Sequence, residues 1–223
     1  MWLIGIDEAG RGSLVGELII AAFGVPKERE EELVRLGVRD SKELTRRQRE
    51  SLYWELTRTG VFAALPITPR EIDSENLNRL EERRAWDLIR IVFSRVGGPS
   101  LVEAVYIDKF GELRELPSKL ARAGYRGLLV VESKADSNYP VVSAASIIAK
   151  VLRDWRIDVL RSMYGVRGSG YPADPETRRW VMAVLSSGWR PPIIRYSWST
   201  LEGTDAFVKK VKRPSRTLED FMV

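Results

Sequence analysis

The stretch that decides the fold reads WLIGIDEAGRG and covers residues 2–12. Residues 2–6 are apolar apart from one glycine and predict a buried β-strand, which runs into Asp7 and Glu8 before a glycine turn. A second apolar stretch over residues 17–25 is too short for a typical helix and predicts another strand. We therefore expect the chain to begin with a β-hairpin whose first strand runs into two acids.

Helix and strand patterns alternate after this hairpin. Capping boxes at Thr45 and Thr68 predict two helix starts, and Gly97 and Gly165 predict two helix ends. The apolar spacing predicts helices over residues 45–59, 77–96, 116–123, 141–164 and from 174 to before 188, and strands over residues 61–68, 101–107 and 127–131. Two strands followed by alternating helices and strands predict an α/β fold, with a mixed sheet flanked by helices and a helical C-terminal part.

The composition excludes several kinds of chemistry. The 223 residues include no Cys and no His, which excludes thiol nucleophiles, disulfides, cysteine zinc sites and the Ser-His-Asp arrangement. Catalysis must therefore come from carboxylates, Lys, Tyr, Ser or the backbone, and a hard cation held by oxygen ligands suits that set best.

The charge balance and the apolar runs indicate which partners and which cellular location to expect. Lys and Arg number 36 against 31 Asp and Glu, and a net charge of +5 permits a polyanionic partner without requiring one. The longest apolar run, residues 18–25, is too short to cross a bilayer. We therefore expect a cytoplasmic monomer with no membrane segment.

Three strand-like runs end in or near an acid. Asp7 and Glu8 follow the first strand, Asp108 ends the strand over residues 101–107, and Asp136 comes shortly after the strand over residues 127–131. Strand ends in α/β sheets are where sites are usually built, and converging carboxylates would repel one another unless cations lay between them. Each acid alone can also be a solvated strand end or a helix N-cap.

Asp7 and Glu8 present a geometric difficulty, because neighbours on a regular strand point to opposite faces. Both can reach one site only if the strand ends there and the chain turns.

The Gly10-Arg11-Gly12 turn is not a nucleotide loop of a known kind. The dinucleotide fingerprint requires glycine at position 15, which is Val15, and a phosphate-binding P-loop requires Gly-Lys before Ser or Thr, whereas Gly16 precedes a Glu. What remains is a tight turn whose N–H groups allow a phosphate or a sugar hydroxyl to approach, or a plain turn.

Several short motifs occur in an order that resembles the type 2 ribonucleases H, in particular the archaeal-looking branch of ribonuclease HII. The motifs are GIDEAGRG (5–12), DSK (40–42), YID (106–108), ESKAD (132–136), VSAASIIAK (142–150) and GSGYP (168–172). They span nearly the whole chain, and their order is far more specific than any single motif.

The resemblance implies a ribonuclease H-like fold and hydrolysis of the RNA strand of RNA–DNA hybrids. It also implies incision 5′ to a single ribonucleotide embedded in a DNA duplex, by two-metal-ion catalysis that leaves 3′-hydroxyl and 5′-phosphate ends. Asp7, Glu8, Asp108 and Asp136 then correspond to the catalytic, metal-binding carboxylates, with Mg²⁺ or Mn²⁺ as cofactor. The catalytic domain would cover residues 1–202, including a helical substrate-binding part.

The same resemblance implies a set of substrate-binding residues. It assigns Gly10, Arg11, Gly12 and Tyr171 to reading the 2′-hydroxyl, and Lys42, Ser143 and Ser146 to phosphate contacts. A 2′-hydroxyl is the one group that distinguishes RNA from DNA at a given site. The alternatives are a packed loop aromatic for the tyrosine, a solvated lysine, and serines in close helix packing.

The basic tail, residues 203–223, resembles the peptide with which archaeal relatives bind the sliding clamp. Leu218, Phe221 and Met222 correspond to its apolar residues, although Ser215 stands where Gln is expected and Met222 where a second aromatic is expected. The alternative is a chain end that packs on its own domain.

Three other functions remain open on sequence grounds. A resolvase- or transposase-like nuclease shares the fold but has no 2′-hydroxyl to read. A non-catalytic nucleic-acid-binding module explains the basic charge, but it leaves the four acids unexplained because they would repel phosphates without metal. A Ser-Lys hydrolase needs no His, although the helices show no supporting Ser-x-x-Lys.

Overall fold

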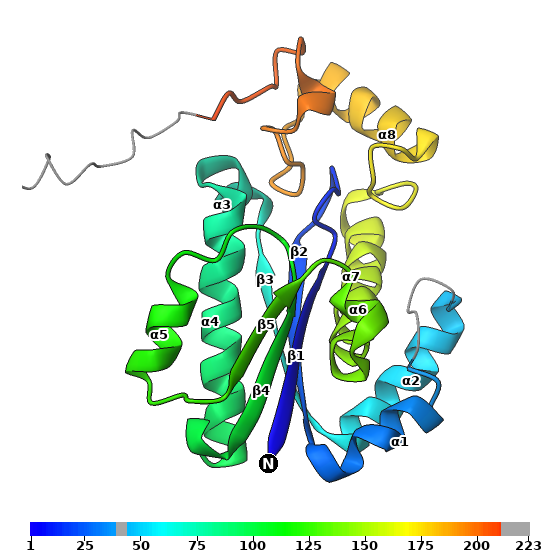
Figure 1. The fold of residues 1–223 in the computed structure, drawn as a ribbon. Helices are drawn as coiled ribbons and strands as arrows, with labels where there is room; N and C mark the ends of the chain where they lie inside the picture. The colour runs from blue at the N-terminus through cyan, green and yellow to red at the C-terminus, as the bar shows by residue number, and fades with distance from the viewer. Residues whose placement is uncertain (39–43, 211–223) are drawn as a thin grey trace, which may run out of the picture.

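The computed structural model describes residues 1–38 and 44–210, in which five strands form one mixed sheet of order β3-β2-β1-β4-β5 (Figure 1). The strands are β1 (Trp2–Ala9), β2 (Leu18–Pro26), β3 (Val61–Ile67), β4 (Val102–Asp108) and β5 (Leu128–Glu132). β1, β2 and β3 pair antiparallel, whereas β1, β4 and β5 pair parallel. The predicted α/β class and the opening hairpin are confirmed.

Eight α-helices lie in the described ranges, and those with caps in the sequence begin or end at them. They are α1 (Glu30–Arg35), α2 (Arg46–Thr59), α3 (Pro69–Ser74), α4 (Leu77–Val96), α5 (Leu116–Arg122), α6 (Ala135–Asn138), α7 (Pro140–Tyr164) and α8 (Pro175–Ser186), with short 3₁₀ turns at Lys27–Arg29, Pro99–Leu101 and Ser199–Leu201. Thr45 and Thr68 form complete capping boxes, and α4 and α7 end at left-handed glycines. No helix in the described ranges is both long and apolar enough to span a membrane.

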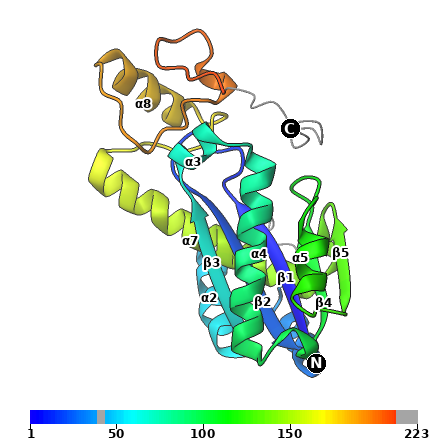
Figure 2. The ribbon, with the colours of Figure 1, turned by 90° about the vertical axis from the view of Figure 1, so that its left-hand side faces the viewer.

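Two helical layers enclose the sheet (Figures 1 and 2). The buried side chains of Ile4 and Ile6 face the layer that contains α4, whereas Leu3 faces the layer that contains α7. Because neighbouring strand residues point to opposite faces, the apolar run of β1 contributes to both cores. Two-sided burial explains why this strand reads as a continuous apolar stretch.

The C-terminal part packs against the turn that follows β1. Leu14 and Val15 form a third buried cluster with α8, the end of α7 and the segment around Ile194. Ala206 is also buried in this cluster, so the packed chain continues beyond the predicted boundary at residue 202. The C-terminal part is thereby fixed next to the carboxyl end of β1, where the acids lie.

Candidate active site

Three of the four predicted carboxylates meet at the carboxyl ends of β1 and β4. Ile6 pairs with Ile107 in the parallel register, so the next residues, Asp7 and Asp108, lie side by side. One carboxylate oxygen from each of Asp7, Glu8 and Asp108 lies within 4.8 Å of the others. The side chains are therefore close enough to share a cation.

Asp7 and Glu8 reach one site although β1 does not end at them, so the condition expected from the sequence is wrong. The strand continues through both acids and pairs with β2 as far as Ala9, opposite Ile19. On the other side, its pairing with β4 stops at Ile6. Beyond that residue the β4 edge of β1 is open, which lets side chains from both faces of the strand reach the same space.

Asp136 is buried on α6 and does not belong to this group of three. The Ala135 N–H donates a 2.9 Å hydrogen bond to Asp108 Oδ1, so the start of the helix that carries Asp136 is tied to the site. Lys134 precedes it with φ of 63°, a left-handed conformation that non-glycine residues rarely adopt. The assignment of Asp136 as a fourth ligand stays a prediction.

The electrostatics of the site favour a bound cation. Burial, with a contribution from the charge of Asp108, raises the pKa of Asp7 to about 6, and a hydrogen bond with Ser146 acts in the opposite direction. Burial and the charges of Asp7 and Glu81 raise the pKa of Glu8 as well. Glu8 Oε2 is buried without a hydrogen-bond partner. Closely packed carboxylate oxygens, one of them without a hydrogen-bond partner, fit a hard divalent ion.

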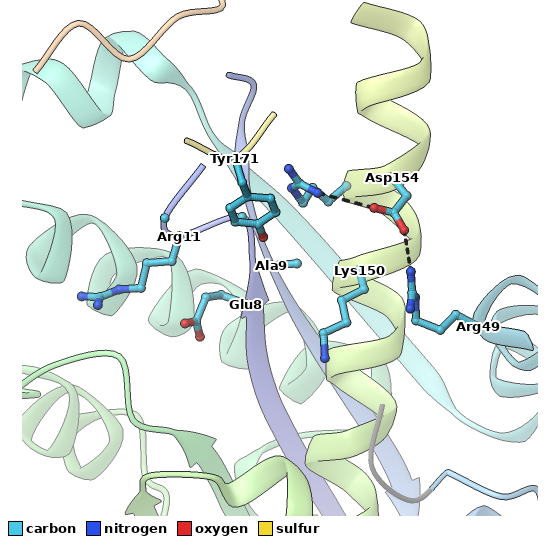
Figure 3. Close-up of a pocket in the computed structure, with 10 residues that line it drawn as sticks. Glu8, Ala9, Arg11, Arg49, Lys150, Asp154 and Tyr171 are labelled. Carbon is cyan, nitrogen blue, oxygen red and sulfur yellow. Dashed lines mark hydrogen bonds and ion pairs between the residues drawn. The ribbon is translucent and has the colours of Figure 1, made fainter. Parts of the chain in front are cut away.

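A cavity of about 420 Å³ opens beside the acids (Figure 3). Its lining consists of Glu8, Ala9, Gly10, Arg11, Gly12, Arg49, Lys150, Arg153, Asp154 and Tyr171. In Figure 3, Tyr171 lies between Arg11 on one side and Lys150 of α7 on the other. Asp154 forms ion pairs with Arg49 and Arg153, whereas Glu8 belongs to the acidic group. The cavity therefore combines basic side chains with one of the acids, as binding of a phosphodiester next to a metal requires.

The glycine turn and the tyrosine loop are joined by hydrogen bonds. The Gly170 carbonyl accepts from the Leu14 N–H at 2.8 Å, from the Val15 N–H at 3.1 Å and from the Ser13 hydroxyl at 2.9 Å. Tyr171 follows this carbonyl directly. Two segments more than 150 residues apart in sequence therefore form one wall of the cavity.

Arg153 is a residue of this wall that the sequence reasoning missed. It is buried, donates to the Ser169 carbonyl at 2.6 Å, and its guanidinium lies 4.3 Å from the centre of the Tyr171 ring. A cation over an aromatic face holds the ring in place. Its spacing from Ser146 and Lys150 puts all three residues on one face of α7, and this pattern could have identified it.

Of the other residues predicted to contact the substrate or a partner, two serines are buried and the rest lie outside the described residues. Ser143 and Ser146 are fully buried, and Ser146 interacts with Asp7, so a positioning role fits Ser146 better than a direct phosphate contact. Lys42 lies outside the described residues. The tail residues Leu218, Phe221 and Met222 also lie outside them.

The fold and the site together define a metal-dependent nuclease with a ribonuclease H-like fold. The sheet is mixed and flanked by helices, acids lie at the ends of β1 and β4, and the chain contains no His or Cys. The family model for ribonuclease HII matches residues 4–201, and the chain belongs to that family. It is therefore a metal-dependent endonuclease that cleaves the RNA strand of RNA–DNA hybrids.

Curated and solved relatives agree with this assignment. Ribonuclease HII of Aeropyrum pernix is 50% identical over 224 residues, which cover 99% of this chain and 98% of that protein. The crystal structure of ribonuclease H2 from Pyrococcus horikoshii is 37% identical, with a TM-score of 0.76 over 90% of this chain and 95% of the other. The structure of the PCNA–RNase HII complex from Archaeoglobus fulgidus is 32% identical, with a TM-score of 0.76 over 99% and 100%.

Proposed function

We propose that this enzyme also incises DNA duplexes on the 5′ side of a single embedded ribonucleotide, leaving 3′-hydroxyl and 5′-phosphate ends. The observation that carries the proposal is the wall formed by the glycine turn and the Tyr171 loop, which stands beside Glu8 in the same cavity. A turn built from glycines lets a sugar approach the backbone closely, and an aromatic ring can stack on the neighbouring sugar or base.

Two divalent ions, Mg²⁺ or Mn²⁺, would be held by Asp7, Glu8, Asp108 and Asp136. When bound, such ions neutralise the developing charge of a phosphodiester and lower the pKa of water. The protein's own contribution is positional. Ser146 constrains Asp7, and the Ala135 N–H holds one oxygen of Asp108, so both carboxylates are oriented before a ligand arrives.

The experiment that tests this proposal compares two 5′-labelled duplexes, one all DNA and one with a single ribonucleotide, in Mg²⁺ and in EDTA. We expect a nick only in the second duplex, on the 5′ side of the ribonucleotide and only with Mg²⁺. Cutting of both duplexes would instead indicate a resolvase-like nuclease. Binding without any cutting would indicate a nucleic-acid-binding module and contradict the metal assignment.

Replacing Tyr171 by Ala is expected to slow incision at a lone ribonucleotide about tenfold, and cleavage of a long RNA tract less. Loss of base or sugar stacking is worth on the order of 1–3 kcal/mol, and a tract offers alternative registers that a lone ribonucleotide does not. The measurement is kcat/KM on both substrates. Equal losses on the two would argue against a role in reading the junction.

We further propose that the tail binds a sliding clamp through Leu218, Phe221 and Met222. The A. fulgidus relative is known in complex with PCNA, and the match to it covers 99% of this chain. The double replacement Leu218→Ala with Phe221→Ala is expected to weaken clamp binding at least about tenfold, because apolar anchors dominate such interfaces. Arg216→Ala serves as the control. Unchanged affinity of the double variant by calorimetry would reject this assignment.

A further inference from the structure

A C-terminal segment pairs with the chain just after the glycine turn. Val15 and Ile194 form an antiparallel bridge, and the Gly16 N–H donates to the Ile193 carbonyl at 2.8 Å. The Arg195 N–H donates to the Leu14 carbonyl at 3.0 Å. This short pairing places the Arg195 side chain beneath the turn.

The Arg195 guanidinium is completely buried and binds backbone rather than a carboxylate. Nε donates to the Gly16 carbonyl at 3.1 Å, and Nη1 donates to the Arg11 carbonyl at 2.9 Å. Within residues 1–38 and 44–210, no carboxylate forms a salt bridge with it, and its Cζ atom lies over the Trp198 ring, 5.2 Å from the ring centre. Burial lowers the pKa of Arg195 to about 10, so it keeps its charge at neutral pH. Asp73 and Glu17 act on this charge only through space. A buried charge without a direct ion pair is costly, which calls for a reason at this position.

The guanidinium of Arg11, in turn, is held by residues of α4. Its Nε donates to Glu81 Oε1 at 2.8 Å and its Nη2 donates to Asn78 Oδ1 at 2.7 Å. The Glu81 side chain is completely buried. Arg11 is therefore clamped twice, through its carbonyl by Arg195 and through its guanidinium by Glu81.

Because the peptide bond is planar, fixing the Arg11 carbonyl also fixes the direction of the Gly12 N–H. The Arg11 carbonyl and the Gly12 N–H belong to the same trans peptide unit, so they point in opposite directions. When Arg195 holds the carbonyl, the Gly12 N–H must face away from the protein interior. In the described part of the chain this N–H has no acceptor, and the space around Gly12 is open on its side-chain side.

We propose that Arg195 and Glu81 are positioning residues that aim the Gly12 N–H at the 2′-hydroxyl of the ribonucleotide, and that discrimination between RNA and DNA therefore depends on both of them. This inference rests on the proposed function and adds two residues that touch no substrate themselves. The two glycines give the backbone on either side of Arg11 more conformational freedom than other residues would. The clamp removes that freedom before substrate binds, which is what a site selective for one hydroxyl group needs.

The test compares Arg195→Lys with the wild type on a single-ribonucleotide duplex and on a hybrid with a long RNA tract. Lysine keeps the charge but lacks the planar fork that reaches two carbonyls. We expect kcat/KM to fall about tenfold on the first substrate and less than about threefold on the second. With Ca²⁺ replacing Mg²⁺, the preference in binding affinity for the ribonucleotide duplex over all-DNA duplex should fall by a similar factor.

Arg190→Lys is the matched control, because Arg190 Nη1 also donates to two backbone carbonyls in the C-terminal part, those of Leu185 and Trp189, without touching the turn. It should leave the ratio between the two substrates unchanged. Glu81→Gln should shift the ratio in the same direction as Arg195→Lys but less, because an amide oxygen still accepts from Arg11.

The outcomes separate the inference from the proposed function. If the wild type does not prefer the ribonucleotide duplex, the proposed function fails and the inference fails with it. If the wild type shows the preference and Arg195→Lys retains it, the inference alone is overturned. Should Arg195→Lys fold poorly by thermal unfolding, Glu81→Gln decides, and an unchanged ratio there overturns the inference equally.

Discussion

Replacing Asp7 by Asn is expected to reduce cleavage of every substrate at least about 100-fold, the loss typical of removing a main electrostatic contact from an active site. Asp7 has a carboxylate oxygen within 4.8 Å of those of Glu8 and Asp108, so its charge contributes to the binding of any cation held there. Binding of a labelled hybrid should stay measurable, because the basic part of the cavity is unchanged. Full activity in Asp7→Asn would contradict the metal-site assignment.

The same substitution is expected to stabilise the metal-free protein at neutral pH. Burial raises the pKa of Asp7 from 3.8 to about 6, so the folded state binds a proton more tightly than the unfolded state does. The wild type therefore loses stability as pH rises from about 4 through about 6, whereas an Asn at this position does not titrate. In EDTA, the Tm of Asp7→Asn relative to the wild type should rise across that interval and remain higher at pH 8.

Asp174→Asn is a control for which we expect the opposite change in Tm. Hydrogen bonds from the Ser169 and Glu176 backbone N–H groups hold the pKa of Asp174 below its usual value. Its ionised form stabilises the fold above the unfolded pKa, and this contribution disappears as pH falls. Asp174→Asn should therefore lower the Tm at pH 8. If both variants shift the Tm in the same direction at that pH, the electrostatic explanation for Asp7 is wrong.

Replacing Gly5 by Ala is expected to destabilise the protein by about 1–3 kcal/mol, the range for overpacking a tight core. A Cβ at this position of β1 would lie 2.3 Å from the backbone carbon and oxygen of Val141 and 2.5 Å from the nitrogen of Val142. These are backbone atoms at the start of α7, which cannot rotate away as a side chain could. The helix would have to move as a whole, and urea unfolding measures the cost.

The shift should also affect activity, because α7 carries Ser146, Lys150 and Arg153 along the site. Gly12→Ala is the control for stability, since an added Cβ there meets no atom within 4 Å. We expect the urea midpoint of Gly12→Ala to match that of the wild type. A Gly5→Ala protein as stable as the wild type would show that β1 and α7 do not pack this closely.

Much of the secondary structure of this protein could be predicted from its sequence because it depends on interactions between residues close together in the chain. The capping boxes at Thr45 and Thr68 join residues three positions apart, so their partners can be read directly from the sequence. The apolar periodicity located the strands and long helices for the same reason, and the acids at the strand ends followed from it. The order of the motifs indicated the ribonuclease HII family, which the match over residues 4–201 confirms.

The tertiary structure alone decided how these parts act on one another. It kept Asp7 and Glu8 inside β1 and let them meet at an open strand edge, because pairing with β4 stops at Ile6. It also showed how the turn is held: Arg11 binds Glu81 across 70 residues, and Arg195 binds the Arg11 carbonyl across 184. A buried charge is stabilised by partners that only folding brings near, and no local pattern in the sequence records which partners those are.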